Sequence, residues 1–265
     1  MSVLEPARSQ AGFAASNASH AVAATQATGT LAAAALSVRF QGLTALADVD
    51  LAVARGEVLG LIGPNGAGKT TLVNCLTGFQ APVSGRVLLD GRDTAGWKPE
   101  RYRRAGVART FQSGRLFRSL TVLENVEVTG IGLGFTRVRA ARHARETLDW
   151  LGIGRIADKV AGTLPYTDER RVGIARALVL RPSFILLDEP AAGMSDAECD
   201  ELMGFVAAIP KVFRCGVLLI EHNMRIVMGA CDRIHVLDGG RTIAEGTPAE
   251  IQRDQAVIAA YLGES

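Results

Sequence analysis

The sequence lacks the long apolar runs that membrane-spanning and secreted proteins carry. No apolar run among its 265 residues approaches the about 20 residues needed to cross a bilayer. Residues 1–5 also lack a basic segment followed by an apolar stretch, which is the usual start of a secretory signal. We therefore expect a protein that lies in the cytoplasm.

Paired cysteines and clustered basic residues are missing as well. The four cysteines lie in different predicted elements with no C-x-x-C spacing, which indicates neither a zinc site nor a disulfide framework. They are Cys75, Cys199, Cys215 and Cys231. The net charge is only +2 with both signs interspersed, whereas nucleic-acid binding needs basic residues gathered on one face. We expect small core cysteines and no nucleic-acid partner.

What the sequence does contain is enough apolar material for a full core, since 48% of its residues are hydrophobic. Residues 1–34 are the exception, because they are rich in Ala, Ser, Thr, Gln and Asn and show no sustained amphipathic period. We therefore expect a mobile N-terminal tail at 1–34 and one folded domain at 35–265.

The folded part divides into three segments that differ in predicted secondary structure. Short β-rich runs at 36–40, 49–53, 58–62 and 86–89 predict a β-rich N-terminal layer. Long helical stretches then dominate, which predicts an inserted helical subdomain at about 113–170. Helices at 170–180 and 196–208 alternate with strands at 184–187 and 217–220, and a hairpin and a terminal helix end the chain. This alternation predicts a parallel sheet with helices on both faces.

The most specific motif is a glycine-rich run that fits G-x-x-x-x-G-K-[ST] between a predicted strand and a predicted helix. It consists of Gly63, Pro64, Asn65, Gly66, Ala67, Gly68, Lys69 and Thr70. Glycines let the backbone fold round phosphates, and main-chain N–H groups at a helix N-terminus attract negative charge. Lys69 reaches the β- and γ-phosphate oxygens, and the Thr70 hydroxyl can ligate magnesium. The sequence therefore predicts a nucleoside triphosphate site.

Two carboxylates follow the apolar strand at 184–187. Asp188 is placed to hold the nucleotide's magnesium, usually through water, and Glu189 to orient or deprotonate the attacking water. A strand that ends in two acids is by itself mostly structural, but the metal at a phosphate loop needs a carboxylate nearby. The functional interpretation is therefore favoured for Asp188 and Glu189.

Another apolar strand, at 217–220, ends in Glu221 and His222. His222 is able to reach a γ-phosphate from such a position. The alternative is a solvated or hydrogen-bonded histidine with no catalytic role, which is the usual state of a lone histidine at a strand end.

From residue 36 onward the chain resembles the ATP-binding cassette (ABC) transporter ATPases, whose motifs occur in this order. The resemblance implies an α/β P-loop NTPase with a RecA-like core, an antiparallel β subdomain and an inserted helical subdomain. It implies ATP and Mg²⁺ as ligands and ATP hydrolysis as the reaction. It also implies that Phe40 stacks on adenine, that Thr71 closes the Walker A loop, and that Gln112 senses the metal and the membrane partner.

The same resemblance implies that Asp188 and Glu189 are the Walker B pair, with Asp188, Thr70 and Gln112 as the metal-binding set. Residues 191–196 match the D-loop, and His222 matches the switch histidine that contacts the γ-phosphate. Residues 164–168 occupy the signature position, which implies that Tyr166, Thr167 and Asp168 approach a nucleotide.

A finer resemblance is to the ATPases of branched-chain amino acid importers, through residues 42–46, 115–117, 120–125, 220–224 and 261–264. It implies that ATP-driven dimer closure is coupled to import of branched-chain or other hydrophobic amino acids. The implied partners are two membrane permease subunits, a second ATPase that is identical or different, and a periplasmic or extracellular solute-binding protein. The implied location is peripheral, at the cytoplasmic face of the inner membrane. Such systems also serve urea, amides and aromatic acids.

The signature departs from the family pattern Leu-Ser-Gly-Gly-Gln, since this chain reads Leu164, Pro165, Tyr166, Thr167 and Asp168. Thr167 replaces a glycine that permits close approach, and Asp168 places an acid near a phosphate. One interpretation is that Thr167 or Asp168 caps the following helix. Another is an impaired composite site, which would make the chain a nucleotide-binding regulatory subunit of a mixed dimer. A soluble ABC protein not tied to transport is a further alternative.

Overall fold

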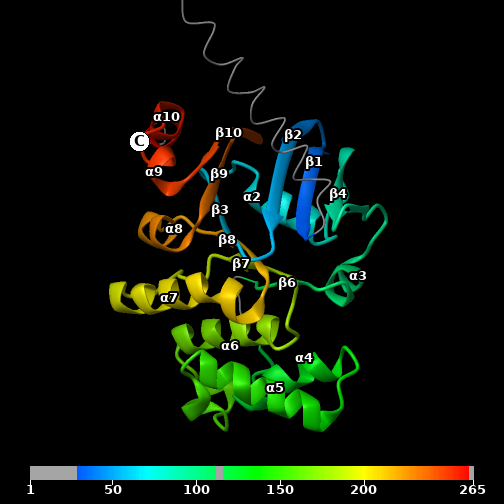
Figure 1. Cartoon of the computed structure of the whole chain (residues 1–265), viewed down its shortest axis with the longest axis vertical. Coiled ribbons are helices and arrows are strands. Elements are labelled where there is room, and N and C mark those ends of the chain that lie inside the picture. The colour runs from blue at the N-terminus through cyan, green and yellow to red at the C-terminus, as the bar shows by residue number, and fades with distance from the viewer. Residues whose placement is uncertain (1–28, 112–115, 263–265) are drawn as a thin grey trace, which may run out of the picture.

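Two β-sheets organise the part of the chain that the structure describes, residues 29–111 and 116–262 of a computed structural model (Figure 1). One sheet is antiparallel, with strand order β2-β1-β4-β5, and the other has strand order β10-β9-β3-β8-β7-β6. The strands are β1 (Thr30–Phe40), β2 (Leu43–Ala54), β3 (Val58–Ile62), β4 (Ser84–Leu89), β5 (Arg92–Asp93), β6 (Val107–Arg109), β7 (Phe184–Asp188), β8 (Gly216–Ile220), β9 (Arg233–Asp238) and β10 (Arg241–Gly246).

The six-stranded sheet is parallel from β9 to β6, and only β10 pairs antiparallel, with β9. Successive side chains of a strand point to opposite faces, so its central strands feed two separate cores. In β3, Val58 and Ile62 face one core while Leu59 and Leu61 face the other. Both faces are covered, which is why these strands read as unbroken apolar runs.

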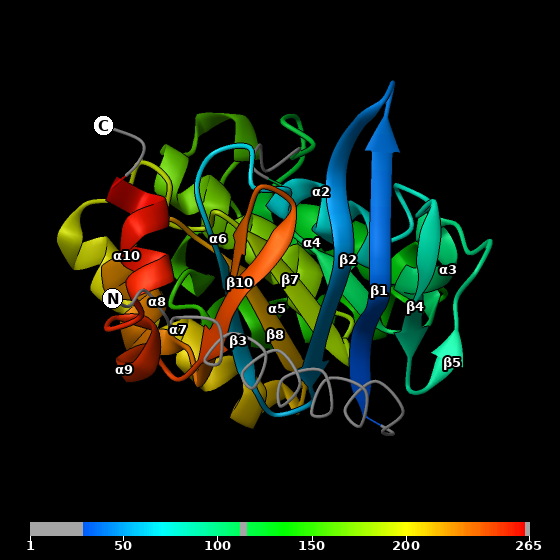
Figure 2. The same cartoon turned by 90° about the horizontal axis from the view of Figure 1, so that it is seen from above.

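Helix α2 (Lys69–Leu76) packs between the two sheets. Its buried residues Leu72, Val73 and Leu76 share a core with the antiparallel sheet and with one face of the parallel sheet. Figure 2 shows α2 beside the antiparallel sheet. The start of α2 is therefore held from two sides.

The opposite face of the parallel sheet carries the helical region. Helices α4 (Val122–Ile131) and α5 (Arg137–Trp150) lie at the lower end of Figure 1, and α6 (Tyr166–Leu178) lies between them and the sheet. A capping box of Thr121 and Glu124 begins α4. The remaining helical segments are α3 (Pro99–Arg104), η1 (Gly154–Ile156), η2 (Ala161–Thr163), α7 (Asp196–Phe213), α8 (Met224–Ala230), α9 (Pro248–Ile251) and α10 (Gln255–Leu262).

The N-terminal boundary expected at residue 34 is wrong, because β1 begins at Thr30. Residues 30–33 pair with β2 and residues 31–34 pair with β4, and Ala32 and Ala33 are fully buried. Alanine has little intrinsic preference for strands, so only the pairing on both sides makes this segment a strand. Residues 1–28 of the expected tail lie outside the described residues. The expected helical subdomain contains α4 and α5, but α6 runs past its end at 170 to Leu178.

All four cysteines are buried, and burial raises the pKa of the Cys75, Cys215 and Cys231 thiols to about 12. They pack as small apolar side chains. No helix within residues 29–111 and 116–262 combines the length and the apolar character that crossing a membrane requires.

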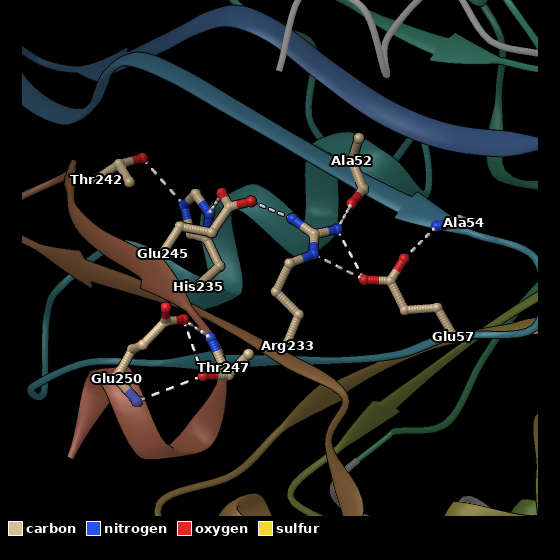
Figure 3. Close-up of polar contacts among 9 residues, drawn as sticks. All are labelled: Ala52, Ala54, Glu57, Arg233, His235, Thr242, Glu245, Thr247 and Glu250. Carbon is tan, nitrogen blue, oxygen red and sulfur yellow. Dashed lines mark hydrogen bonds and ion pairs between the residues drawn. The ribbon is translucent and has the colours of Figure 1, made fainter. Parts of the chain in front are cut away.

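A polar network fixes the C-terminal hairpin to the rest of the fold (Figure 3). Arg233 on β9 donates to a Glu57 carboxylate oxygen at 2.9 Å and to the main-chain oxygen of Ala52 at 2.6 Å, and it pairs with Glu245 on β10. The fully buried ring of His235 contacts Glu245 at 2.8 Å through Nδ1 and the Thr242 hydroxyl at 3.0 Å through Nε2. Glu245 on β10 thus binds both Arg233 and His235 on the neighbouring strand β9.

We expect Glu245→Gln to lower the free energy of unfolding by about 1.5–3 kcal/mol at neutral pH, the usual contribution of hydrogen bonds to a charged group. Burial opposes ionisation of Glu245, but the hydrogen bond from His235 and the charges of His235 and Arg233 outweigh it and lower the pKa of Glu245. A lowered folded pKa means that the stabilisation is complete above the ordinary glutamate pKa and is lost as the pH falls through the folded pKa. Urea unfolding between pH 7 and pH 3 measures both effects.

The matched control is Asp158→Asn, which removes a carboxylate at an exposed position. This control is expected to leave the free energy of unfolding within about 0.5 kcal/mol of the wild type. A Glu245→Gln deficit that stays the same down to pH 3 would contradict the assignment of the charge to the network.

Candidate nucleotide-binding site

The glycine-rich run forms a tight loop between β3 and α2, and its shape requires glycine at two positions. Gly63 has a φ of 146°, and a side chain there would collide with the main-chain oxygen of Leu237. Gly68 has a φ of 100°, and a Cβ atom there would lie 2.7 Å from the main-chain oxygen of Ala45. A left-handed backbone and close approach by other strands both exclude larger residues.

The N-terminus of α2 carries no side-chain cap, because its N-cap residue is Gly68. Lys69 begins the helix, and its Nζ donates to the main-chain oxygens of Gly63 at 2.5 Å and Pro64 at 2.8 Å. Thr70 is exposed and Thr71 is half-buried in the first turn. Main-chain N–H groups at a helix N-terminus, a lysine and a hydroxyl together form a site suited to phosphate.

The floor of the loop is held by the turn between β9 and β10. The N–H of Gly240 donates to the oxygen of Ala67 at 3.1 Å, and the N–H of Ala47 donates to the oxygen of Gly240 at 2.9 Å. Ala67 is buried, whereas Asn65 and Gly66 face outward. The loop therefore has a fixed inner wall and an open outer edge.

Both acids predicted from the sequence lie where β7 ends, at the same edge of the parallel sheet as the phosphate loop. The Asp188 side chain is 10% exposed and forms an ion pair with Arg109 at 2.7 Å. Glu189 follows with a φ of 46°, unusual for a bulky residue, and its N–H donates to the oxygen of Ile220 at 2.9 Å. Such backbone outliers persist only where the surroundings enforce them, and they gather at functional sites.

The end of β8 brings His222 to this edge, because β8 lies between β3 and β7. Its side chain is exposed. The preceding Glu221 is buried, and its carboxylate accepts from the N–H groups of Ala191 at 2.8 Å, His222 at 3.1 Å and Asn223 at 3.2 Å. Glu221 therefore ties the loop after Glu189 to the turn that carries His222.

The signature residues lie on the other face of the parallel sheet, at the start of α6. The helix is capped by Pro165 without a side-chain hydrogen bond, so the prediction that Thr167 or Asp168 caps it is wrong. Both are in the first turn, where Asp168 and Glu169 suit the positive end of the helix dipole. Helix α6 starts at Tyr166, four residues earlier than the sequence predicts. No side-chain cap marks this start.

The Thr167 hydroxyl hydrogen-bonds to Glu198, which also accepts from the main chain and hydroxyl of Ser195. These bonds, led by those from Ser195, hold the pKa of Glu198 below the ordinary value. Tyr166 is half exposed, bonds to Arg170 and lies beside Gly193. The signature turn is thus connected to the segment after Glu189 within one chain.

For two of the predicted site residues, Phe40 and Gln112, the described structure gives no contact with the site. Phe40 ends β1 in a hairpin tip and is 46% exposed. Gln112 lies outside the described residues, which resume at Leu116. The adenine contact and the role of Gln112 stay predictions.

Sequence reasoning assigned no role to Arg109, Asn74 or Glu221, although all three contact the predicted site. Arg109 reaches Asp188 and Asn74, and Glu221 supports His222. The only signal in the sequence is position, because each ends or follows a segment that carries a motif. Their partners are distant in sequence, so no local pattern indicates them.

Oxygen donors are available for a divalent cation beside the phosphate loop. The Thr70 hydroxyl begins α2 and the Asp188 carboxylate ends β7. Magnesium is usually held by one or two such oxygens together with substrate phosphates, so this donor set fits Mg²⁺. No cluster of three or more His, Cys, Asp or Glu placed to hold a metal occurs in the described parts of the chain.

A strand, a glycine-rich loop and a helix with Lys69 and Thr70, facing two acids at the end of a parallel strand, define a P-loop nucleotide-binding protein. The profile of the ABC transporter family matches residues 46–192. The chain therefore belongs to the ABC transporter family, as an ATP-binding cassette of the kind that hydrolyses ATP to drive transport. A second profile, that of the branched-chain amino acid ATP-binding cassette transporter, matches residues 241–265.

Known proteins agree with this assignment. The high-affinity branched-chain amino acid transport ATP-binding protein LivG of Salmonella typhimurium is 44% identical over 250 residues, which are 89% of this chain and 98% of LivG. The ADP conformation of MJ1267, an ATP-binding cassette of an ABC transporter, superimposes with a TM-score of 0.80 at 30% identity and covers 88% of this chain and 98% of its own. The dimeric post-hydrolysis cassette MJ0796, bound to ADP and phosphate, gives a TM-score of 0.74 at 25% identity, with 82% and 98% covered.

Proposed function

We propose that this cassette powers the import of branched-chain or other hydrophobic amino acids, and that it works on the cytoplasmic face of the cell membrane. The observation that carries the cargo is the C-terminal match at 241–265 to the branched-chain family, together with the 44% identity to LivG. The partners that we propose are two permease subunits, which receive a solute-binding protein on the other side of the membrane.

The proposed chemistry follows from the strand ends that meet beside the phosphate loop. Main-chain N–H groups and Lys69 bind the phosphates, and Lys69 exchanges its bonds to Gly63 and Pro64 for phosphate oxygens. Thr70, Asp188 and Gln112 would hold Mg²⁺, which supplies charge stabilisation to the transferred phosphoryl group. Glu189 accepts the proton of the attacking water, and His222 contacts the γ-phosphate.

We further propose that two cassettes act together. The open outer edge of the phosphate loop and the signature turn lie on opposite faces of the sheet, because α2 and α6 belong to different cores. Tyr166, Thr167 and Asp168 of one chain therefore lie away from the nucleotide that the same chain binds. In a second cassette packed head to tail, these residues contact that nucleotide. The dimeric state of MJ0796 supports this arrangement.

The test of the proposed cargo is reconstitution of the chain with its permease subunits and binding protein in vesicles. We expect Mg²⁺-dependent ATP hydrolysis that rises when the binding protein is loaded with leucine, isoleucine or valine, and uptake of the same labelled amino acids. Urea and an aliphatic amide are the matched controls. Stimulation by urea or the amide but not by leucine would contradict the cargo and would leave the ATPase assignment intact.

A further inference from the structure

One buried arginine joins three segments that meet at the nucleotide site. Arg109 is the last residue of β6, and its Nη2 donates to Oδ2 of Asp188 at 2.7 Å. Its Nη1 donates to Oδ1 of Asn74 at 2.6 Å, and Asn74 lies on α2, the helix that begins at the phosphate loop. The Arg109 and Asp188 side chains are only 8% and 10% exposed. The Asp188 carboxylate is therefore linked through one guanidinium to α2.

Two aromatic rings lie against the same guanidinium. Its carbon lies 5.2 Å from the centroid of the Phe111 ring and 5.9 Å from that of Phe79. The two rings contact each other edge to face at 5.8 Å. Phe111 directly precedes Gln112, so the arginine contacts the segment that leads to Gln112 as well as Asp188.

The main chain adds a second connection between β6 and the end of β7. The Thr110 N–H donates to the oxygen of Leu186 at 2.9 Å, and the Asp188 N–H donates to the Thr110 hydroxyl at 3.1 Å. The position of the Asp188 backbone is thus set by Thr110 and the direction of its carboxylate by Arg109. Only Oδ2 takes part in the ion pair, which leaves Oδ1 outside it.

Stability alone is a weak reason for this arrangement. Removing two charges from water is costly, and a buried ion pair often stabilises a fold no more than apolar side chains of similar volume. The Nε atom of Arg109 is also buried without a hydrogen-bond partner, as judged over the described structure. An arginine kept at this cost, with its fork on a carboxylate and an amide, is better explained by control of the carboxylate's direction.

We propose that Arg109 is a positioning residue, which holds the Asp188 carboxylate in the orientation that receives Mg²⁺ and links it to α2 and to the segment of Phe111. This inference rests on the metal-binding role proposed above for Asp188. Partners that hydrogen-bond to a metal-ligating carboxylate orient it, and their loss weakens metal binding about 10- to 100-fold. Mg²⁺-dependent nucleotide binding therefore depends on Arg109, although Arg109 contacts neither ion nor nucleotide.

The test uses the full chain and a fluorescent, non-hydrolysable ATP analogue, titrated with and without Mg²⁺. In Arg109→Met, which keeps an apolar stem beside Phe79 and Phe111, the Mg²⁺ concentration for half-maximal enhancement of binding is expected to rise about 10- to 100-fold. Binding of the analogue in EDTA is expected to stay within about twofold of the wild type. Arg109→Lys restores part of the Mg²⁺ response, because one ammonium keeps the charge but lacks the fork that reaches Asn74 and Asp188 together.

Two further variants separate this role from simple destabilisation. Arg55→Met removes an ion pair of the same 2.7 Å length, to Asp90 in the turn between β4 and β5, and is expected to leave the Mg²⁺ response unchanged. Asn74→Ala keeps the ion pair of Arg109 with Asp188 but removes its second anchor. It is expected to raise the Mg²⁺ requirement by a smaller factor than Arg109→Met does. If Arg109→Met does not fold, Asn74→Ala tests the positioning role of Arg109 in its place.

Asp188→Asn, measured in the same titration, separates the metal-binding role of Asp188 from the positioning role of Arg109. If Asp188→Asn weakens the Mg²⁺ response while Arg109→Met and Asn74→Ala do not, Asp188 binds the metal and the role of Arg109 is wrong. A tighter Mg²⁺ response in Arg109→Met would also overturn the proposal, because the guanidinium would then compete with the ion. If Asp188→Asn itself has no effect, the metal assignment of Asp188 fails, and the role of Arg109 fails with it.

Discussion

Glu189→Gln is expected to reduce Mg²⁺-dependent ATP hydrolysis about 100- to 10,000-fold, the usual contribution of a general base. The amide keeps the size and hydrogen-bonding ability of the side chain but cannot accept a proton from water. ATP binding should persist, because the phosphate loop and Lys69 are untouched. Single-turnover hydrolysis of radiolabelled ATP by the assembled transporter, beside equilibrium binding of ATP, measures both quantities.

The matched control for this variant is Glu146→Gln on α5. The half-exposed Glu146 carboxylate forms an ion pair of 3.1 Å with Arg181, and this pair is not part of the nucleotide site. The Glu146→Gln variant is expected to hydrolyse ATP at the wild-type rate. Substantial hydrolysis by Glu189→Gln would show that another group takes the proton, and the role of Glu189 would then be limited to the unusual turn after β7.

Lys69→Met is expected to weaken ATP binding about 10- to 100-fold, which corresponds to the loss of about 1.5–3 kcal/mol of charged hydrogen bonds. Methionine preserves the length of the stem but removes the ammonium that bonds to Gly63 and Pro64 in this structure and that we propose for the phosphates. Isothermal titration with ATP and with adenosine measures the effect. Adenosine binding should not change, because adenosine has no phosphate.

Lys211→Met provides the control, since Lys211 is exposed in the last turn of α7. Equal ATP affinities for Lys69→Met and the wild type would contradict the placement of the phosphates on this loop. A loss of adenosine binding alongside ATP binding would instead indicate that the substitution disturbs the fold between β3 and α2.

The sequence predicted those parts of the molecule whose structure is set by neighbouring residues. The phosphate loop is one example, because the φ values of Gly63 and Gly68 exclude other residues and so leave a local pattern. The apolar runs of β7 and β8 are another, since strands buried on both faces need apolar side chains at every position. The order of strand and helix then fixed the fold class.

Short or atypical segments escaped prediction for an identifiable reason. Strand β6 has only three residues, Val107–Arg109, too few to show a period. The first residues of β1 are mostly alanine and are strand only because β2 and β4 pair with them. Helix α7 runs through Pro210 to Phe213, beyond the end predicted from the sequence at 208. In each case packing overrides the local preference.

By itself, then, the sequence determined the glycine loop, the acids at the end of β7 and the order of the elements, because contiguous residues specify each of them. Only the tertiary structure decided which side chains act on these motifs. Arg109 lies 79 positions from Asp188, and Glu221 lies 30 positions from Ala191. Hydrogen bonds of this kind depend on parallel pairing of β6, β7 and β8, a non-local arrangement that brings distant strand ends to one edge.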